Sequence, residues 1–469
     1  MSDGLRVARA ALADRRAWVV GGALRDRALG RSTADVDIVL DGDPAAGARA
    51  VARAAGGAAC FALSVEFGAW RVIARDRSWQ VDIEPLRADT LEADLALRDF
   101  TANAIAEPIG GGEPVDPLGG LADLSARLLR MAGPGAFSDD PVRVLRLVRV
   151  SIELDLTPDP ATLRAAAATA PALAGVSPER VFIELRRVVS AERAVRGLEL
   201  MAETGATAVV LPELQALRGV QQSRFHHLDV YEHTIEVLAQ AIALSRDPAP
   251  LTADEADAIE LRSLLSEPLA DELTRSEALR WGALLHDAAK PLTREERPGD
   301  GRVTFLGHDV AGADLARRAL GRLRSSERLR GHVAALVRHH LRLGFLVHEP
   351  QPLSRRTVFT YLYACSPVEV DVTLLSVADR LATRGERADE SIQAHVALAR
   401  GMLHDALRWR AQGPPAPLLG GDELIGELGV APGPVVGELL ARLAEAQYAG
   451  EITTRDQALA LARRELDAS

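Results

Sequence analysis

The chain has 469 residues, of which 48% are hydrophobic and 26% charged, and its mean hydropathy of +0.02 is typical of a globular protein of several domains. Its formal net charge of −11 excludes a surface coated uniformly with cations for nucleic acid, because contacts to phosphate need lysine or arginine. Local basic tracks are compatible with this average.

The cysteines and the apolar runs bear on where the protein works. Only Cys60 and Cys365 are present, far apart in the sequence, which excludes a disulfide framework and a cysteine zinc site. We find no apolar run long enough to cross a bilayer, and the first residues lack the apolar region of a secretory signal. We therefore expect a cytoplasmic protein without a membrane partner.

The first part of the chain mixes strand and helix patterns. Short apolar runs predict strands at residues 18–20, 36–40, 70–74 and 80–84, and a polar turn at residues 75–78 separates the last two. Residues 23–29 have a helical pattern. The rest of the chain has Ala/Leu/Arg helical periodicity. The predicted fold class is α+β, a small head followed by an all-α body.

Carboxylates and glycines of the head form a pattern that suits phosphoryl transfer. Asp35 and Asp37 flank Val36 at the start of a predicted strand, so strand periodicity places both carboxylates on one face. Asp82 on a later strand supplies a third acid for a two-metal site. Gly21-Gly22 follows a strand and lets backbone N–H groups approach a phosphate. Each feature alone is more often plain turn chemistry.

The helical body contains basic stripes. Arginines recur every three residues at Arg143, Arg146 and Arg149, and further arginines follow at 180, 186 and 187. By itself such a stripe is usually a solvated helix face. Ser177-Pro178-Glu179 predicts a helix start, because serine is a good N-cap and proline fits the first helical position.

Five motifs occur in one order along the head and the first body helix. They are GGALRD (21–26), ADVD (34–37), LRDFTANAIA (97–106), VDPLGGLADL (115–124) and SDDPVRVLRLVR (138–149). In these motifs the chain resembles the class II tRNA nucleotidyltransferases and bacterial poly(A) polymerases, whose heads belong to the polymerase-beta-type superfamily.

The resemblance implies roles for single residues. Asp35 and Asp37 would bind Mg²⁺, and Asp82 would help to orient the primer 3′ hydroxyl. The residues implied in nucleotide binding are Gly21 and Gly22 at the triphosphate, Arg25 and Asp26 bracing that turn, Arg98, Asp99 and Asn103 at triphosphate and ribose, and Asp140, Arg143 and Arg146 at the base. A carboxylate and a guanidinium offer acceptors and fixed donors that match a base edge without a template.

A second series of histidines and aspartates lies in the body, where imidazole and carboxylate suit a divalent transition metal. The series comprises His233, His286, Asp287, His308, His339, His340 and Asp379. Its motifs, such as LLHDAAKP (284–291) and FLGHD (305–309), resemble those of the HD phosphohydrolase superfamily. The resemblance implies an HD domain whose metal site comprises these seven residues.

The sequence patterns divide the chain into four segments, and the resemblances imply what each one does. The segments are a nucleotidyltransferase head at residues 1–135, a helical base-reading and RNA-binding neck at 136–215, an HD domain at 220–410, and a helical tail that binds tRNA at 415–469. A charged loop at residues 294–302 and a linker at 413–417 interrupt the helices.

The expected function is a tRNA nucleotidyltransferase that adds or repairs the 3′-terminal CCA from CTP and ATP. The stretch between Arg87 and Asp94 is very short, where CCA-adding members carry a longer loop linked to the switch from C to A. This resembles enzymes that add only CC, which is one alternative, and a poly(A) polymerase is another. A different class of alternative is a metal-dependent phosphohydrolase working through the HD domain. A third is an RNA-binding protein with an inactive head, against which the intact motif acids argue.

Overall fold

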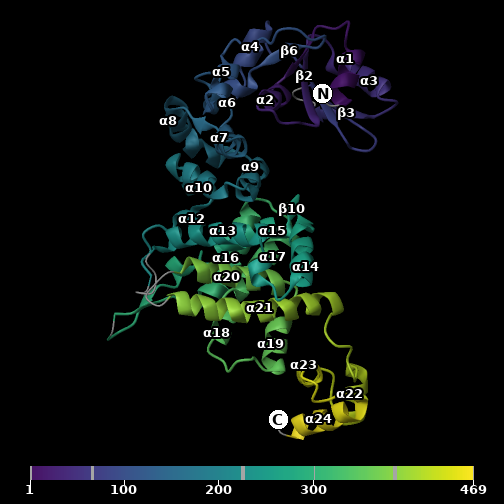
Figure 1. Ribbon diagram of the computed structural model, residues 1–469, viewed down its shortest axis with the longest axis vertical. Helices are drawn as coiled ribbons and strands as arrows, with labels where there is room; N and C mark the ends of the chain where they lie inside the picture. The colour runs from purple at the N-terminus through teal and green to yellow at the C-terminus, as the bar shows by residue number, and fades with distance from the viewer. Residues whose placement is uncertain (1–2, 65–67, 223–227, 300, 384–387, 468–469) are drawn as a thin grey trace. The chain divides into compact units, whose positions relative to one another are not determined.

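The computed structural model describes residues 3–64, 68–222, 228–299, 301–383 and 388–467. The chain divides into two compact units, Met1–Val210 and Leu211–Ser469 (Figure 1). One sheet of more than two strands is present in the described residues, and it lies in the first unit, while helices dominate elsewhere. The predicted α+β class is therefore confirmed.

The head is built on a six-stranded sheet with the order β3-β4-β5-β2-β1-β6. Its strands are β1 (Ala17–Val20), β2 (Asp35–Leu40), β3 (Ala59–Ser64), β4 (Ala69–Ile73), β5 (Gln80–Pro85) and β6 (Ala106–Pro108). Strands β2 and β5 are parallel, and the other neighbouring pairs are antiparallel. All four predicted strands are present. The sequence did not predict the edge strands β3 and β6, because β3 is largely exposed and β6 contains Glu107 and Pro108.

Apolar side chains hold the head together. Val19, Ile38 and Val81 from neighbouring strands are fully buried. Helix α3 (Pro44–Ala54) packs closely on the sheet, since a Cβ at Gly47 would lie 2.8 Å from a methyl of Leu40. The other head helices are α1 (Asp3–Ala11), α2 (Gly22–Ala28), α4 (Leu91–Ala96) and α5 (Gly120–Ser125), with a 3₁₀ turn at Thr101–Asn103.

The neck continues the first unit as a helical bundle (Figure 1). Its helices are α6 (Ala136–Asp139), α7 (Arg143–Leu154), α8 (Pro160–Thr169), α9 (Pro178–Ser190), α10 (Ala194–Glu203) and α11 (Ala206–Val210), and β7 (Leu128–Leu129) pairs with β8 (Thr157–Pro158). Helix α9 begins after Ser177 with Pro178 in its first turn, as predicted. A buried ion pair between Arg149 and Glu184 joins α7 to α9, with 2.5 Å between Nε and Oε2.

The second unit is helical, with a core that contains the fully buried Trp281. Its helices are α12 (Pro212–Gln215), α13 (Val230–Arg246), α14 (Glu255–Ser266), α15 (Arg275–Leu285), α16 (His308–Arg322), α17 (Glu327–His339), α18 (Arg342–Leu346), α19 (Arg355–Cys365), α20 (Glu369–Ala382), α21 (Ala388–Gln412), α22 (Gly421–Leu428), α23 (Pro434–Tyr448) and α24 (Arg455–Asp467). The last three helices form the tail around Leu424, Leu439 and Leu443.

Two short hairpins interrupt these helices. Strand β9 (Pro268–Ala270) pairs with β10 (Leu273–Thr274), and β11 (Glu295–Glu296) pairs with β12 (Val303–Thr304). The segment predicted as a charged loop, residues 294–302, thus includes strand β11. Among the described residues, no single helix has the length and apolar character of a membrane span, and only the bent pair α19 and α20, which meet at 100°, meets the criterion together.

Candidate active site and metal centre

The sheet register brings the glycine turn and the acids of the head together. Val20, the last residue of β1, pairs with Asp37 of β2, so Gly21 follows directly beside this carboxylate. Asp37 in turn pairs with Asp82 on the parallel strand β5. Residues that are far apart in the sequence therefore meet at one point of the sheet, as the motif order predicts.

Gly21 is required by both its backbone and its surroundings. Its φ is +68°, a left-handed conformation that favours glycine. A Cβ at this position would lie 3.2 Å from Nη1 of Arg98 and 3.5 Å from Oδ2 of Asp37. A side chain would therefore occupy the space between the turn, the arginine and the carboxylate. Gly22, the first residue of α2, has Nη2 of Arg25 as its nearest neighbour.

The three head carboxylates differ in their surroundings. Asp35 is exposed. Burial raises the pKa of Asp37 to about 6, with further repulsion from Asp82 and Glu84. Asp82 is held by Arg71 on β4, which donates from Nε and Nη2 at 2.7 Å each to the two carboxylate oxygens. Among the described residues, these acids do not converge into a ready cluster of metal ligands.

The predicted triphosphate and ribose block forms a hydrogen-bond chain that runs from the head into the neck. Arg25 donates to Asn103 at 2.8 Å, and Asn103 donates to Asp99 at 2.8 Å. Asp99 accepts from Nη2 of Arg146 on α7 at 2.7 Å. Although burial opposes it, the Arg146 guanidinium lowers the pKa of Asp99 to about 2. Arg25 also donates to Asp26 at 2.9 Å, as expected for residues bracing the turn.

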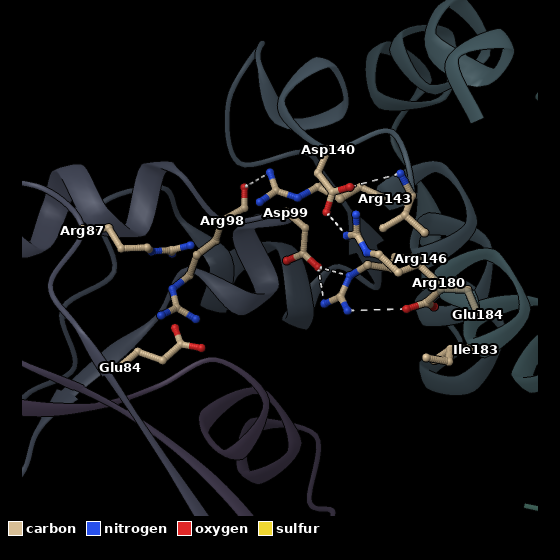
Figure 2. Close-up of a pocket in the computed structure, with 11 residues that line it drawn as sticks. Glu84, Arg87, Arg98, Asp99, Asp140, Arg143, Arg146, Arg180, Ile183 and Glu184 are labelled. Atoms are coloured by element: carbon tan, nitrogen blue, oxygen red, sulfur yellow. Dashed lines mark hydrogen bonds and ion pairs between the residues drawn. The ribbon is translucent and has the colours of Figure 1, made fainter. Parts of the chain in front are cut away.

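Half of the ten residues predicted to bind the nucleotide line one pocket of about 440 Å³ within the first unit (Figure 2). Its lining contains the predicted Arg98, Asp99, Asp140, Arg143 and Arg146, together with Glu84, Arg87, Val142, Arg180, Ile183 and Glu184. The lining alternates guanidinium and carboxylate groups, which suits a ligand that carries both phosphates and a polar base edge.

The predicted base-reading pair is engaged with protein partners. Arg143 donates from Nη1 to the carbonyl of Ala136 at 3.0 Å and from Nη2 to that of Leu97 at 3.0 Å. Asp140 accepts from Nη2 of Arg180 on α9 at 2.6 Å (Figure 2). The two side chains lie in the same pocket, but each is held by a different part of the unit.

The short stretch after β5 is tied down by Asp94. This fully buried carboxylate accepts from the backbone N–H of Arg87 at 3.0 Å and from its Nε at 3.2 Å. It also forms an ion pair with Arg98 at 3.7 Å. Thr90 caps α4 by accepting from the N–H of Ala93. The connection from β5 to α4 is consequently short and held at both ends.

In the second unit, imidazoles and carboxylates converge from several helices. Two groups have ligand atoms within 4.8 Å of one another, one of His233, His286 and Asp379 and one of Asp287, His308 and His340. Nε2 of His233 lies 3.0 Å from Asp379, and Nε2 of His308 lies 3.3 Å from Nε2 of His340. The structure therefore brings together all the predicted HD residues except His339.

The fit of this cluster to a metal ion follows from its hydrogen bonds. The Nδ1 atoms of His286, His308 and His340 each lie 2.7–2.8 Å from the backbone carbonyl three residues earlier. If Nδ1 carries the proton, the Nε2 lone pairs point at the centre of the cluster. Nε2 of His286 lies 3.1 Å from Oδ2 of Asp287, and this buried carboxylate oxygen also pairs with Nζ of Lys290 at 2.7 Å. Neutral imidazoles and carboxylates are the donor set that divalent metals prefer.

The adjacent His339 was predicted as a ligand, and the structure places it elsewhere. Its Nδ1 accepts from Nε of Arg342 at 2.9 Å. Neighbouring residues at the end of a helix point in different directions, so only one of the two histidines faces the cluster. The cluster opens into a cavity of about 280 Å³ that is also lined by Lys290, Arg380 and His395.

Sequence reasoning did not single out Arg71, Asp94 or Arg180 as site residues. Arg71 could have been found from the turn at residues 75–78, because that hairpin register pairs it with Asp82. Arg180 had no such signal, since its contact with Asp140 depends on how α9 packs against α7.

Three family models match successive parts of the chain. Residues 17–130 match the poly A polymerase head domain, residues 155–217 match the probable RNA and SrmB-binding site of polymerase A, and residues 230–384 match the HD domain. A head of this kind and an HD domain imply dependence on divalent metal.

Full-length relatives are similar over nearly the whole chain. The chain is 39% identical to an A-adding tRNA nucleotidyltransferase of Deinococcus radiodurans, over 96% of this chain and 95% of the relative. It is 34% identical to a CC-adding tRNA nucleotidyltransferase of Thermus thermophilus, over 95% and 92%. Its fold is similar to that of a CCA-adding enzyme in complex with ATP, with a TM-score of 0.66 and 17% identity over 98% and 95% of the two chains.

Proposed function

The chain belongs to the family of class II tRNA nucleotidyltransferases and bacterial poly(A) polymerases, and on that basis we propose that it adds or repairs the 3′-terminal CCA of tRNA from CTP and ATP. The observation that carries the proposal is one pocket that joins Arg98, Asp99, Asp140 and Arg143. Of these residues, Arg98 reaches the glycine turn, where Asp37 of β2 also lies. The proposed chemistry is attack of the tRNA 3′ hydroxyl on the α-phosphate, with pyrophosphate leaving.

In this proposal Asp35 and Asp37 hold Mg²⁺, which when bound offsets the charge of the triphosphate. Gly21 keeps space for a phosphate between Arg98 and Asp37. Asp82, oriented by Arg71, stands beside Asp37 where the primer hydroxyl arrives. Asp140 and Arg143 select the base, and Arg146 ties the ribose block to the neck through Asp99.

A narrower candidate is favoured by the connection between β5 and α4. Residues 86–90 are all that link these elements, and Asp94 holds Arg87 by backbone and side chain. A connection fixed in this way has little room to reshape the pocket between two bases, which favours one base identity. Of the two full-length relatives named above, one is an A-adding and the other a CC-adding tRNA nucleotidyltransferase. We therefore propose CC-only addition as a second candidate function, and A-only addition as a third.

The HD unit supports a second proposed site. His233, His286, Asp287, His308, His340 and Asp379 would hold a divalent transition metal. The adjoining cavity, with Lys290 and Arg380, suits a phosphate ester of a nucleotide or an RNA end. A metal-dependent phosphohydrolase activity is the function from another class that this geometry favours.

We further propose that tRNA is recognised by shape and backbone, through the neck and the tail, in the cytoplasm. Bases of a paired acceptor stem are poorly accessible to side chains, so a sequence code there is not needed.

The test uses tRNA transcripts that end before the CCA, incubated with CTP alone, ATP alone and both, and read at single-nucleotide resolution. Three added residues with both nucleotides support CCA addition, and two cytidines support the CC-only candidate. Addition of a single A, and solely to transcripts that already end in CC, supports A-only addition. A long A ladder, or no addition to any transcript, would overturn the proposal.

A further inference from the structure

Helix α9 contributes to the nucleotide pocket with residues that no motif names. Arg180, Ile183 and Glu184 line it, and their spacing of three and four residues places them on one helix face. Ile183 is 47% exposed although it is a large apolar side chain, so it offers the pocket an apolar surface for the face of a base. The pocket is thus shared between the motif residues and the neck.

The contact between Arg180 and Asp140 uses one oxygen of the carboxylate. Oδ2 accepts from Nη2 of Arg180 at 2.6 Å. Oδ1 has a long contact of 3.4 Å with the backbone N–H of Val142. A carboxylate oxygen has two lone pairs, so Oδ1 retains capacity for a further donor. The arginine therefore fixes the carboxylate while leaving an acceptor for a ligand.

The position of Arg180 is set by ion pairs along the same helix. Glu184 is buried and pairs with Arg149 of α7 at 2.5 Å and with Arg146 at 3.6 Å. These contacts of Glu184 hold α9 against the helix that begins with Arg143, so Arg180 reaches Asp140 from a fixed support. Arg187 pairs with Glu153 at 2.9 Å outside the pocket, and this partly exposed pair adds little to that support.

We propose that Arg180 is a positioning residue for base selection: it holds Oδ2 of Asp140, so that Oδ1 meets the amino group of cytosine or adenine. This inference rests on the proposed nucleotidyl transfer. The N4 group of cytosine and the N6 group of adenine are donors, whereas uracil and guanine present a carbonyl oxygen at the same place. An oriented acceptor attracts the first two bases and repels the others.

An opposite arrangement makes a contrary prediction. If Arg180 blocked Asp140 until a nucleotide displaced it, removing the guanidinium would tighten nucleotide binding. If Arg180 orients the carboxylate, removing it weakens binding and loosens selection. The direction of the change in KM therefore decides between the two.

The experiment measures KM and kcat for CTP and ATP, and misincorporation of UTP, on the tRNA transcripts described above. The variants are Arg180→Ala and Arg180→Lys, and the control is Arg187→Ala. Arg187 lies on the same helix with a side chain 50% exposed against 53% for Arg180, and its ion pair lies with Glu153 rather than in the pocket. Thermal unfolding of all variants is recorded in parallel.

For R180A we expect KM for the nucleotide that the wild type uses to rise about tenfold, kcat to change little, and misincorporation of UTP to increase. R180K should restore part of the nucleotide affinity and part of the selection against UTP, because lysine keeps a cationic donor but lacks the planar guanidinium. R187A should behave as the wild type. Unchanged or lower KM in R180A, or equal effects of R180A and R187A, would overturn the inference. An inactive wild type would instead count against the proposed nucleotidyl transfer itself.

Discussion

The two carboxylate sites of the chain differ in how their charges are balanced. In the head, burial and the neighbouring Asp82 raise the pKa of Asp37 to about 6, and Asp35 stands exposed at the start of β2. In the HD unit, burial is outweighed by His286 and Lys290, which hold the pKa of Asp287 well below its usual range. Asp37 is repelled by its acidic neighbours, although Arg71 pairs with Asp82, whereas Asp287 lies beside Lys290 and the imidazoles of the HD cluster.

This difference in charge balance and burial suggests that the two sites bind metal in different ways. The HD cluster is buried, with imidazoles oriented by backbone carbonyls, so its ligand geometry exists before a metal arrives. Of the head acids, Asp35 is exposed and Asp37 is buried, and they do not converge with Asp82 into a cluster of ligands, so a metal there needs further oxygens from a triphosphate. We therefore interpret the head as a site loaded together with its substrate and the HD cluster as a resident metal centre.

The largest expected effect comes from removing the head acids. Asp35→Ala with Asp37→Ala should reduce nucleotide addition by a factor on the order of 10³ or more, because they are the two acids of β2 and both are assigned to Mg²⁺ in the proposal. Metal bound by the HD unit should not change. The matched control is Asp41→Ala, an exposed acid just after the same strand that pairs with Arg16. Nucleotide addition that survives the double substitution would contradict the proposed role of Asp35 and Asp37.

The next effect concerns the HD cluster. His286→Ala should lower metal affinity roughly a hundredfold and abolish any phosphohydrolase activity, while nucleotide addition is retained. The control is His404→Ala, because His404 also precedes an aspartate but pairs with Asp257 away from the cluster. Metal content by elemental analysis is the measurement, and His340→Ala provides a second route if H286A fails to fold. Equal metal content in H286A, H340A and wild type would contradict the account.

A smaller effect is expected at Arg71. Arg71→Ala frees Asp82 from its bidentate partner, so kcat for nucleotide addition should fall about tenfold while KM for the nucleotide changes little. Arg71→Lys should recover only part of the rate, because an ammonium group cannot hold both oxygens in one plane. Arg49→Ala is the control. Arg49 belongs to helix α3 and lies over Trp70, a residue of the same strand as Arg71, and its ion pair is with Asp43 rather than with an acid of the site. A rise in KM at unchanged kcat would argue that Asp82 serves the nucleotide rather than the primer.

The smallest expected effect is on stability. The pKa of Asp99 is depressed to about 2 from 3.8, so its contribution is complete above pH 4 and is lost as the pH falls from about 4 to about 2. Asp99→Asn should therefore lower the free energy of unfolding by about 2 kcal/mol at neutral pH, and the difference from wild type should shrink below pH 4. Asp155→Asn, at an exposed ion pair with Arg193, should cost less than about 1 kcal/mol. The measurement is the free energy of unfolding in denaturant at several pH values for wild type and both variants. A difference between wild type and Asp99→Asn that does not depend on pH would contradict the prediction.

The sequence predicted what depends on local pattern. Asp35 and Asp37 lie on β2, and Gly21 follows β1 with a positive φ, because strand alternation and a tight turn leave direct traces in neighbouring residues. The HD residues were found through motif spacing on helices. The prediction was less sharp at His339 and His340, since adjacent residues carry the same chemistry and only the helix end decides which one faces inward.

What the sequence did not show depends on register and packing. Arg71 reaches Asp82 on the neighbouring strand, and Arg180 reaches Asp140 because α9 is anchored by Glu184. Neither contact is marked by composition, since an arginine on a strand or a helix face is usually solvated. The electrostatic setting of the site thus comes from tertiary structure, while its reacting groups come from local sequence.

The contrast between a loaded and a resident metal site is tested most directly by metal retention. Wild type, D35A/D37A and H286A are passed through gel filtration in metal-free buffer, analysed for bound divalent metal, and then assayed for nucleotide addition with and without added Mg²⁺. The account predicts near-stoichiometric metal in wild type and D35A/D37A and little in H286A, with addition in wild type and H286A strictly dependent on added Mg²⁺. Metal that is lost from D35A/D37A but kept by H286A would contradict it.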